Sequence, residues 1–162
     1  MKHMTRRSIL YMALIAPVAS FAVAVTVSGQ SSAPSGQLVG AWRVTEIADA
    51  NGAPNTSPQP GLYIFTKQHY SFVRINGARP LPDYPSNDKA TDAQKVTVFN
   101  QLYMNTGTYT VTGDKLATKA MVAKSAFAIG GAGNQYDFSL TGNNLVLTQR
   151  PQGAVIKLAR LE

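Results

Sequence analysis

The feature that most constrains this fold is a succession of short segments in which apolar and polar residues alternate, with turn-forming residues between them. The segments are 38–47, 61–67, 70–76, 107–112, 115–123, 134–141, 144–149 and 154–161. A period of two is typical of half-buried strands, and Gly113 and Gly142 suit the tight turns of hairpins. A sheet of consecutive antiparallel strands avoids exposed edge strands most simply by closing into a barrel. The pattern therefore predicts an all-β, eight-stranded antiparallel up-and-down barrel.

One segment breaks this pattern and predicts a helix inserted between strands 3 and 4. In "TDAQKVTVFNQLYMN" (91–105), Thr91 and Gln94 have the spacing of a capping box, in which each side chain accepts from the other residue's backbone N–H. Apolar residues then recur at helical spacing at Val96, Phe99, Leu102 and Tyr103. A helix this short is marginal alone, so we expect this stripe to pack against the barrel.

The first segment has the composition of an export signal. A basic start (Lys2, Arg6, Arg7) precedes an apolar run over 9–27 and a small-residue site at 22–24, with 27–29 as a second choice. The paired arginines are also compatible with the twin-arginine route. We expect a signal peptide over 1–24, a flexible linker over 25–36 and a barrel domain over 37–162, in a periplasmic or secreted protein. Without cleavage, the apolar run would remain as an anchor.

Composition argues against several classes of function. The net charge is +7, but three of these charges lie in the leader, and the others are spread singly without interleaved aromatics. That distribution does not favour a nucleic-acid partner. Cysteine is absent, and His69 has no second ligand at metal-binding spacing, so we expect neither a metal site nor a cofactor. No serine has the context of a hydrolytic triad.

The single tryptophan supports a family resemblance. Gly40-x-Trp42 on the first strand, with the basic Arg160 on the last, resembles the pattern of lipocalins and the wider calycin group. The resemblance implies that Trp42 closes one end of the barrel and that Arg160 packs across its ring. The pair would then be structural.

A closer similarity is to the bacterial lipocalin-like domain family, most of whose members are uncharacterised. It covers about residues 37–162 and is carried by "LVGAW", "GLYIFTKQHYSFVRINGARP", "ATDAQK", "NTGTYTVTGDKL", "MVAK" and "YDFSLTGNNLVLT". The helix between the third and fourth strands is shared with this family, whereas secreted lipocalins carry theirs after the eighth strand. The family supplies no established catalytic residues.

Strand parity indicates which side chains could line the barrel. Counting from Trp42 places Val44 and Glu46 on one face, and an inward Phe72 implies an inward Arg74. Such an arginine could grip a carboxylate in an otherwise apolar pocket, or form a structural ion pair with Glu46. The predicted ligand-binding residues are Glu46, Phe65, Phe72, Arg74, Tyr103, Tyr136 and Phe138. The glycine-rich segment 125–134 is expected to be a flexible hairpin loop at the mouth.

Three functions follow from this interpretation. The first is binding of a small hydrophobic or amphipathic molecule inside an exported barrel. The second is a cofactor-independent cyclase or isomerase for an apolar substrate, with Glu46 or Tyr109 as acid or base. The third is a protein-binding barrel, such as a protease inhibitor, that acts through the Pro-rich loops 48–60 and 77–90. The sequence does not indicate an oligomeric state.

Overall fold

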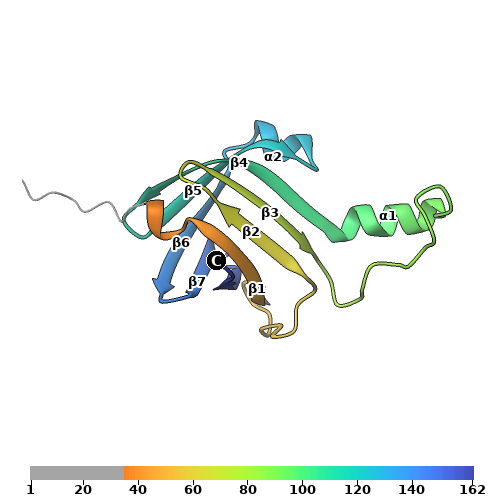
Figure 1. The fold of residues 1–162 in the computed structure, drawn as a ribbon, viewed down its shortest axis with the longest axis horizontal. Coiled ribbons are helices and arrows are strands. Elements are labelled where there is room, and N and C mark those ends of the chain that lie inside the picture. Colours follow the sequence, from red (N-terminus) through yellow and green to blue (C-terminus); the bar gives the residue numbers. More distant parts are fainter. Residues whose placement is uncertain (1–34) are drawn as a thin grey trace, which may run out of the picture.

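The computed structural model describes residues 35–162, which form a closed barrel of eight antiparallel strands (Figure 1). The strands follow one another around the barrel in chain order, and β1 pairs with β8 to close it. Their bounds are β1 Gly40–Ala48, β2 Gly61–Phe65, β3 His69–Ile75, β4 Leu102–Thr112, β5 Lys115–Ala123, β6 Asn134–Thr141, β7 Asn144–Arg150 and β8 Val155–Arg160. The predicted up-and-down barrel is confirmed.

Within residues 35–162, three helices accompany the strands. The short 3-10 helix η1 (Ser35–Gln37) precedes β1, α1 (Asp92–Gln101) lies between β3 and β4, and α2 (Ala126–Gly130) lies between β5 and β6. The expected signal peptide (1–24) and most of the expected linker lie outside the described residues. The last two linker residues belong to η1. Within 35–162, none of the helices has the length and apolar character needed to cross a bilayer.

One end of the barrel is closed by Trp42. Its ring is fully buried, and its Nε1 donates a hydrogen bond of 2.8 Å to the carbonyl of Leu38. The guanidinium of Arg160 lies 4.0 Å from the ring centroid and donates to the carbonyls of Val39 and Gln37, both at 2.7 Å. The cation therefore covers the indole face and ties the chain before β1 to β8.

Aromatic rings fill the middle of the barrel. Tyr63 stacks on Phe72 with centroids 4.8 Å apart, and Phe72 contacts Tyr103 at 5.3 Å. Nearer the closed end, Phe65 meets Tyr109 edge to face at 5.3 Å. An eight-stranded barrel is just wide enough for side chains to fill it, and here they do. The interior is a packed core, so any larger space must lie at its ends or edges.

A β-bulge reverses the side-chain alternation of β1. Val44 pairs with the buried Leu158 of β8, but the register shifts before Glu46, which pairs with the exposed Lys157. Glu46 therefore lies on the outer wall, where its carboxylate is 2.8 Å from the Lys157 ammonium. The expectation that Glu46 shares the inner face with Trp42 is wrong, because the extra residue in the bulge moves it to the other face.

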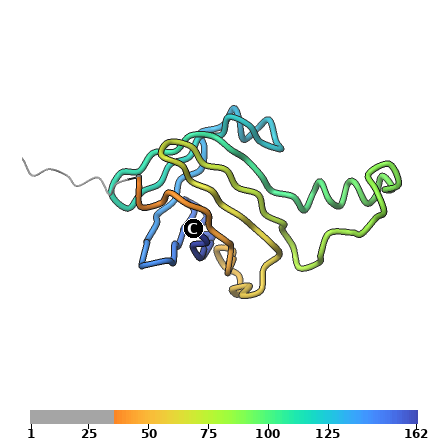
Figure 2. Tube along the Cα trace, in the orientation of Figure 1, coloured from red at the N-terminus to blue at the C-terminus, as the bar shows by residue number. Residues whose placement is uncertain are grey.

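Helix α1 does not pack on the barrel as expected. The capping box of Thr91 and Gln94 is present, but the side chains of Val96 and Phe99 remain 57% and 58% exposed. The helix also ends earlier than predicted, because Leu102 adopts an extended backbone and starts the pairing of β4 with β3. The expected stripe is thus divided between two elements. Figure 2 shows segment 76–101 projecting from the wall before the chain returns along β4.

The segment expected to be a flexible hairpin loop contains helix α2. It packs against β5 and follows Ser125, which has an extended backbone at the helix N-cap. The glycines at 130, 131 and 133 come at the end of this helix and after it, so they end the helix rather than forming a featureless loop.

Candidate functional site

The barrel wall opens between β5 and β6. These strands pair only over Lys115–Thr118 and Asn134–Asp137, and β5 then continues to Ala123 without a partner on β6. The chain fills this space with α2 and returns through Gly133, whose φ is +81°. A Cβ at this position would overlap the carbonyl oxygen of Thr118. Only glycine allows the chain to pass so close to β5 in this conformation.

A cavity of about 270 Å³ lies beneath α2, and we call it the α2 cavity. Its walls come from the inner faces of β3, β4 and β5, from α2, and from the segment that leads to β6. The lining residues are Tyr70, Tyr103, Asn105, Ala120, Phe127, Ala128, Gly131, Ala132, Gly133 and Asn134. Rings and small apolar side chains thus form most of the surface, with few polar groups among them.

Two of those polar groups are buried and lack a well-formed hydrogen bond in the described chain. The side chain of Asn105 is only 4% exposed, and its Oδ1 has no partner within residues 35–162. The hydroxyl of Tyr70 is also buried and, in the same range, has no well-formed hydrogen bond. Burial raises the pKa of Tyr70, and the nearby hydroxyl of Thr118 partly offsets that rise. Leaving such a group unpaired costs about 1–3 kcal/mol, so this edge of the cavity is suited to a polar ligand atom.

A second cavity, of about 300 Å³, lies at the open end of the barrel between the β1–β2 loop and the segment after β3; we call it the mouth cavity. Arg74 lines it from β3. Its guanidinium carbon is 4.9 Å from the ring centroid of Tyr103, and its Nε is buried without a partner in the described chain. The Arg74–Tyr103 contact lies between the two cavities, since Tyr103 lines the α2 cavity and Arg74 the mouth.

The positive charge of Arg74 also acts on the tyrosines of the core. Burial raises the pKa of Tyr63 to about 12, and the guanidinium of Arg74 opposes that rise. Burial likewise raises the pKa of Tyr136, again against the influence of Arg74. Both phenols therefore stay protonated near neutral pH and serve as neutral hydrogen-bonding groups.

The structure brings two of the seven predicted ligand-binding residues to these cavities: Arg74 and Tyr103. The others lie elsewhere. Phe65, Phe72 and Tyr136 are buried in the packed core, Phe138 packs against that core from β6, and Glu46 is on the outer wall. The pair of Glu46 with Arg74 does not form, because Glu46 contacts Lys157 instead.

Sequence reasoning missed Tyr70, Asn105 and the α2 segment as cavity residues. Tyr70 shares the inner face of β3 with Phe72, so strand parity could have found it. Asn105 could not be found in this way, because the sequence places it at the end of a helix, whereas the structure places it within β4.

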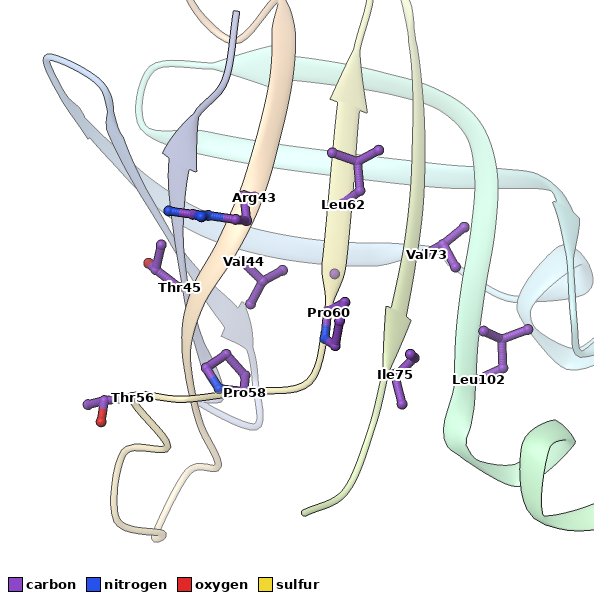
Figure 3. A pocket seen from close by; sticks show the side chains of 11 residues that line it. Arg43, Val44, Thr45, Thr56, Pro58, Pro60, Leu62, Val73, Ile75 and Leu102 are labelled. Atoms are coloured by element: carbon purple, nitrogen blue, oxygen red, sulfur yellow. The ribbon is translucent and has the colours of Figure 1, made fainter. Parts of the chain in front are cut away.

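A larger hollow of about 700 Å³ lies on the outside of the barrel. Figure 3 shows Leu62 of β2 and Val73 of β3 projecting from the wall, with Pro58 and Pro60 on the segment that enters β2. Gly61 has no side chain to separate Val44 from this groove. The groove is open and mostly apolar. Within residues 35–162, no group of His, Asp and Glu is placed to hold a metal ion.

The closed meander of eight strands with α1 between β3 and β4 defines a lipocalin-like barrel. No family model matches the chain, and no curated protein matches it. Among solved structures, a lipocalin-like protein from Bacteroides uniformis is similar at 13% identity and a TM-score of 0.47, over 76% of this chain and 98% of that one. An uncharacterized protein from Bacteroides eggerthii is similar at 14% identity and a TM-score of 0.47, with the same coverage.

Proposed function

We propose that this protein binds a small amphipathic molecule in the α2 cavity. The observation that carries the proposal is that two buried polar groups lie on the wall of one cavity: the Asn105 amide oxygen has no partner in the described chain, and the Tyr70 hydroxyl has only the poorly placed hydroxyl of Thr118. A ligand that donates to Asn105 and bonds with Tyr70 would remove the cost of leaving these groups unsatisfied. The polar end of the ligand would lie there.

The remaining walls of the cavity favour an apolar group at the other end of the ligand. Tyr103, Ala120 and Phe127 present rings and a methyl group, which suit an apolar or aromatic body. At about 270 Å³ the cavity is at the lower limit of the roughly 300–1,000 Å³ typical of ligand pockets. The ligand is therefore compact. A lipid with long acyl chains would not fit inside, because the core beneath is filled by Phe72 and its neighbours.

The enzyme alternative has less support. Its candidate acid, Glu46, is paired with Lys157 on the outer wall. Its second candidate, Tyr109, donates a hydrogen bond of 2.6 Å to the carbonyl of Thr66 and borders neither cavity. No specific feature favours the protease-inhibitor alternative over ligand binding.

The test compares two Tyr→Phe variants by thermal unfolding in the presence of benzyl alcohol, indole and 1-octanol. A ligand that binds only the folded state raises the melting temperature. We expect at least one probe to raise it. Tyr70→Phe should leave the stability of the free protein nearly unchanged and weaken binding about 2- to 10-fold, the effect of one lost hydrogen bond.

Tyr109→Phe is the matched control. It removes the hydroxyl bonded to Thr66, so it should lower the melting temperature of the free protein by the loss of that bond and leave the probe-induced shift intact. If no probe shifts the melting temperature, or if Tyr70→Phe binds as tightly as the unaltered protein, the proposed site is incorrect.

A further inference from the structure

The outer surface next to α2 combines exposed apolar side chains with positive charge. Met121 and Val122 of β5 are each 60% exposed, and Phe127 of α2 is 86% exposed. Lys119 is exposed on the same strand, and Lys124 connects the strand to the helix. We call the surface formed by Lys119, Met121, Val122, Lys124, Phe127 and Ile129 the basic lip.

The lip continues onto α1. The ammonium of Lys124 donates to the carbonyl of Phe99 at 2.7 Å and lies 4.7 Å from its ring centroid. This contact places the exposed Phe99 beside the lip, and the neighbouring Val96 is also exposed. The apolar side of α1, which the barrel does not cover, is therefore part of the same surface.

The charge of the basic lip itself is of one sign. Its charged residues are Lys119 and Lys124, and the chain has no Asp or Glu from residue 115 to 136. On the neighbouring strand β6 the carboxylate of Asp137 is already paired: it contacts Lys115 at 2.6 Å and Arg150 at 2.7 Å. Those partners hold the pKa of Asp137 below its usual range. Within residues 35–162, Lys119 and Lys124 form no ion pair, so an anionic partner would complement the lip, whereas Lys115 is already neutralised.

We propose that the basic lip docks on the surface of an anionic lipid bilayer. Apolar side chains of this kind insert into the interface, while lysines beside them meet anionic headgroups. A second copy of the chain is a poorer match, since a two-fold interface would bring the same basic patch of both copies together without an acidic group to offset it. A folded acidic protein would need hollows for Phe127, Met121 and Val122, whereas a bilayer accepts protruding side chains without preformed complementarity.

Docking would place α2, which lies over the α2 cavity, at the membrane, because Phe127 belongs both to the lip and to the cavity wall. Compact amphipathic molecules concentrate in the same interface. The docking proposal rests on the residues of the lip alone, and it stands or falls independently of ligand binding in the cavity.

The absence of cysteine from the chain allows a site-specific test with the full-length protein. A fluorophore sensitive to polarity is attached at Phe127→Cys in one variant and at Ser139→Cys in another; Ser139 is exposed near the end of β6 that leads to β7, away from α2 and outside the lip. Each is mixed with vesicles of phosphatidylglycerol and phosphatidylcholine, or of phosphatidylcholine alone. The comparison of two positions separates docking of the lip from attachment through the apolar leader.

With anionic vesicles, we expect the emission of the fluorophore at position 127 to shift to shorter wavelength. The shift should be smaller with neutral vesicles or in about 0.5 M salt. The emission of the fluorophore at position 139 should not change. Lys119→Gln should weaken vesicle affinity by roughly fivefold, and Lys157→Gln, which removes one positive charge from β8 outside the lip, should not. Equal shifts at both positions would overturn the proposal. So would a shift at 127 that follows protein concentration without vesicles, or one that polyglutamate produces and vesicles do not.

Discussion

Trp42 and Arg160 offer the most direct test, at the scale of single residues, of how the barrel closes. Trp42→Ala should lower the free energy of unfolding by about 3–5 kcal/mol, because a fully buried aromatic ring is lost. Arg160→Ala should cost about 1–2 kcal/mol through the lost stacking and the two bonds to the carbonyls of Val39 and Gln37. Since both changes remove one contact, the double variant should cost less than the sum. Urea melts of the four proteins would show this, and strictly additive costs would contradict a shared closing role.

The buried tyrosines predict a loss of stability at alkaline pH. Burial raises the pKa of Tyr63 from near 10 to about 12, so above pH 10 the unfolded chain loses a proton that the native protein keeps. The contribution of Tyr63 is fully present below pH 10 and is lost between about pH 10 and pH 12, a total of about 3 kcal/mol. Tyr63→Phe should therefore show a shallower fall in urea melts at pH 9, 10 and 11. If the free energy of unfolding falls with pH equally steeply in both proteins, Tyr63 does not cause the loss of stability.

At the scale of secondary-structure elements, the sequence predicts what is determined locally. The strands and the capping box at Thr91 depend on neighbouring residues, and both are present. The secondary structure of the residues after Gln101 depends on β3, because Leu102 and Tyr103 pair with Ile75 and Arg74 of that strand. Helical spacing alone could not reveal this competition, so Asn105 was assigned to a helix and missed as a cavity residue.

The β-bulge in β1 is another feature that the local sequence does not reveal. Parity places Glu46 inside, and the extra residue between Val44 and Glu46 reverses that placement. Nothing in the sequence of β1 marks the bulge, since it carries no interior glycine there. Similarly, the glycines after α2 suggested a loop, whereas the close approach of Gly133 to Thr118 is a tertiary requirement that only the folded chain reveals.

At the scale of the whole molecule, the protein is a packed barrel whose α2 cavity and mouth cavity lie at its edges. The up-and-down order of the strands and the place of α1 in the chain follow from periodicity and turn residues, and both were predicted. The site was predicted only in part: the expected interior pocket is filled by Phe65, Phe72 and Tyr136. Space remains where β5 and β6 separate and at the open end, and that depends on how the strands diverge rather than on any one of them.

Native mass spectrometry can detect directly whether the α2 cavity holds a small molecule. The protein and its Asn105→Leu variant would be purified from the host organism and compared. The variant replaces an unpaired buried amide with an apolar side chain of similar size, so it should fold at least as stably while losing the polar anchor. We expect a small bound mass on the unaltered protein and none on the variant. A protein without bound mass, or the same mass on both, would contradict this expectation.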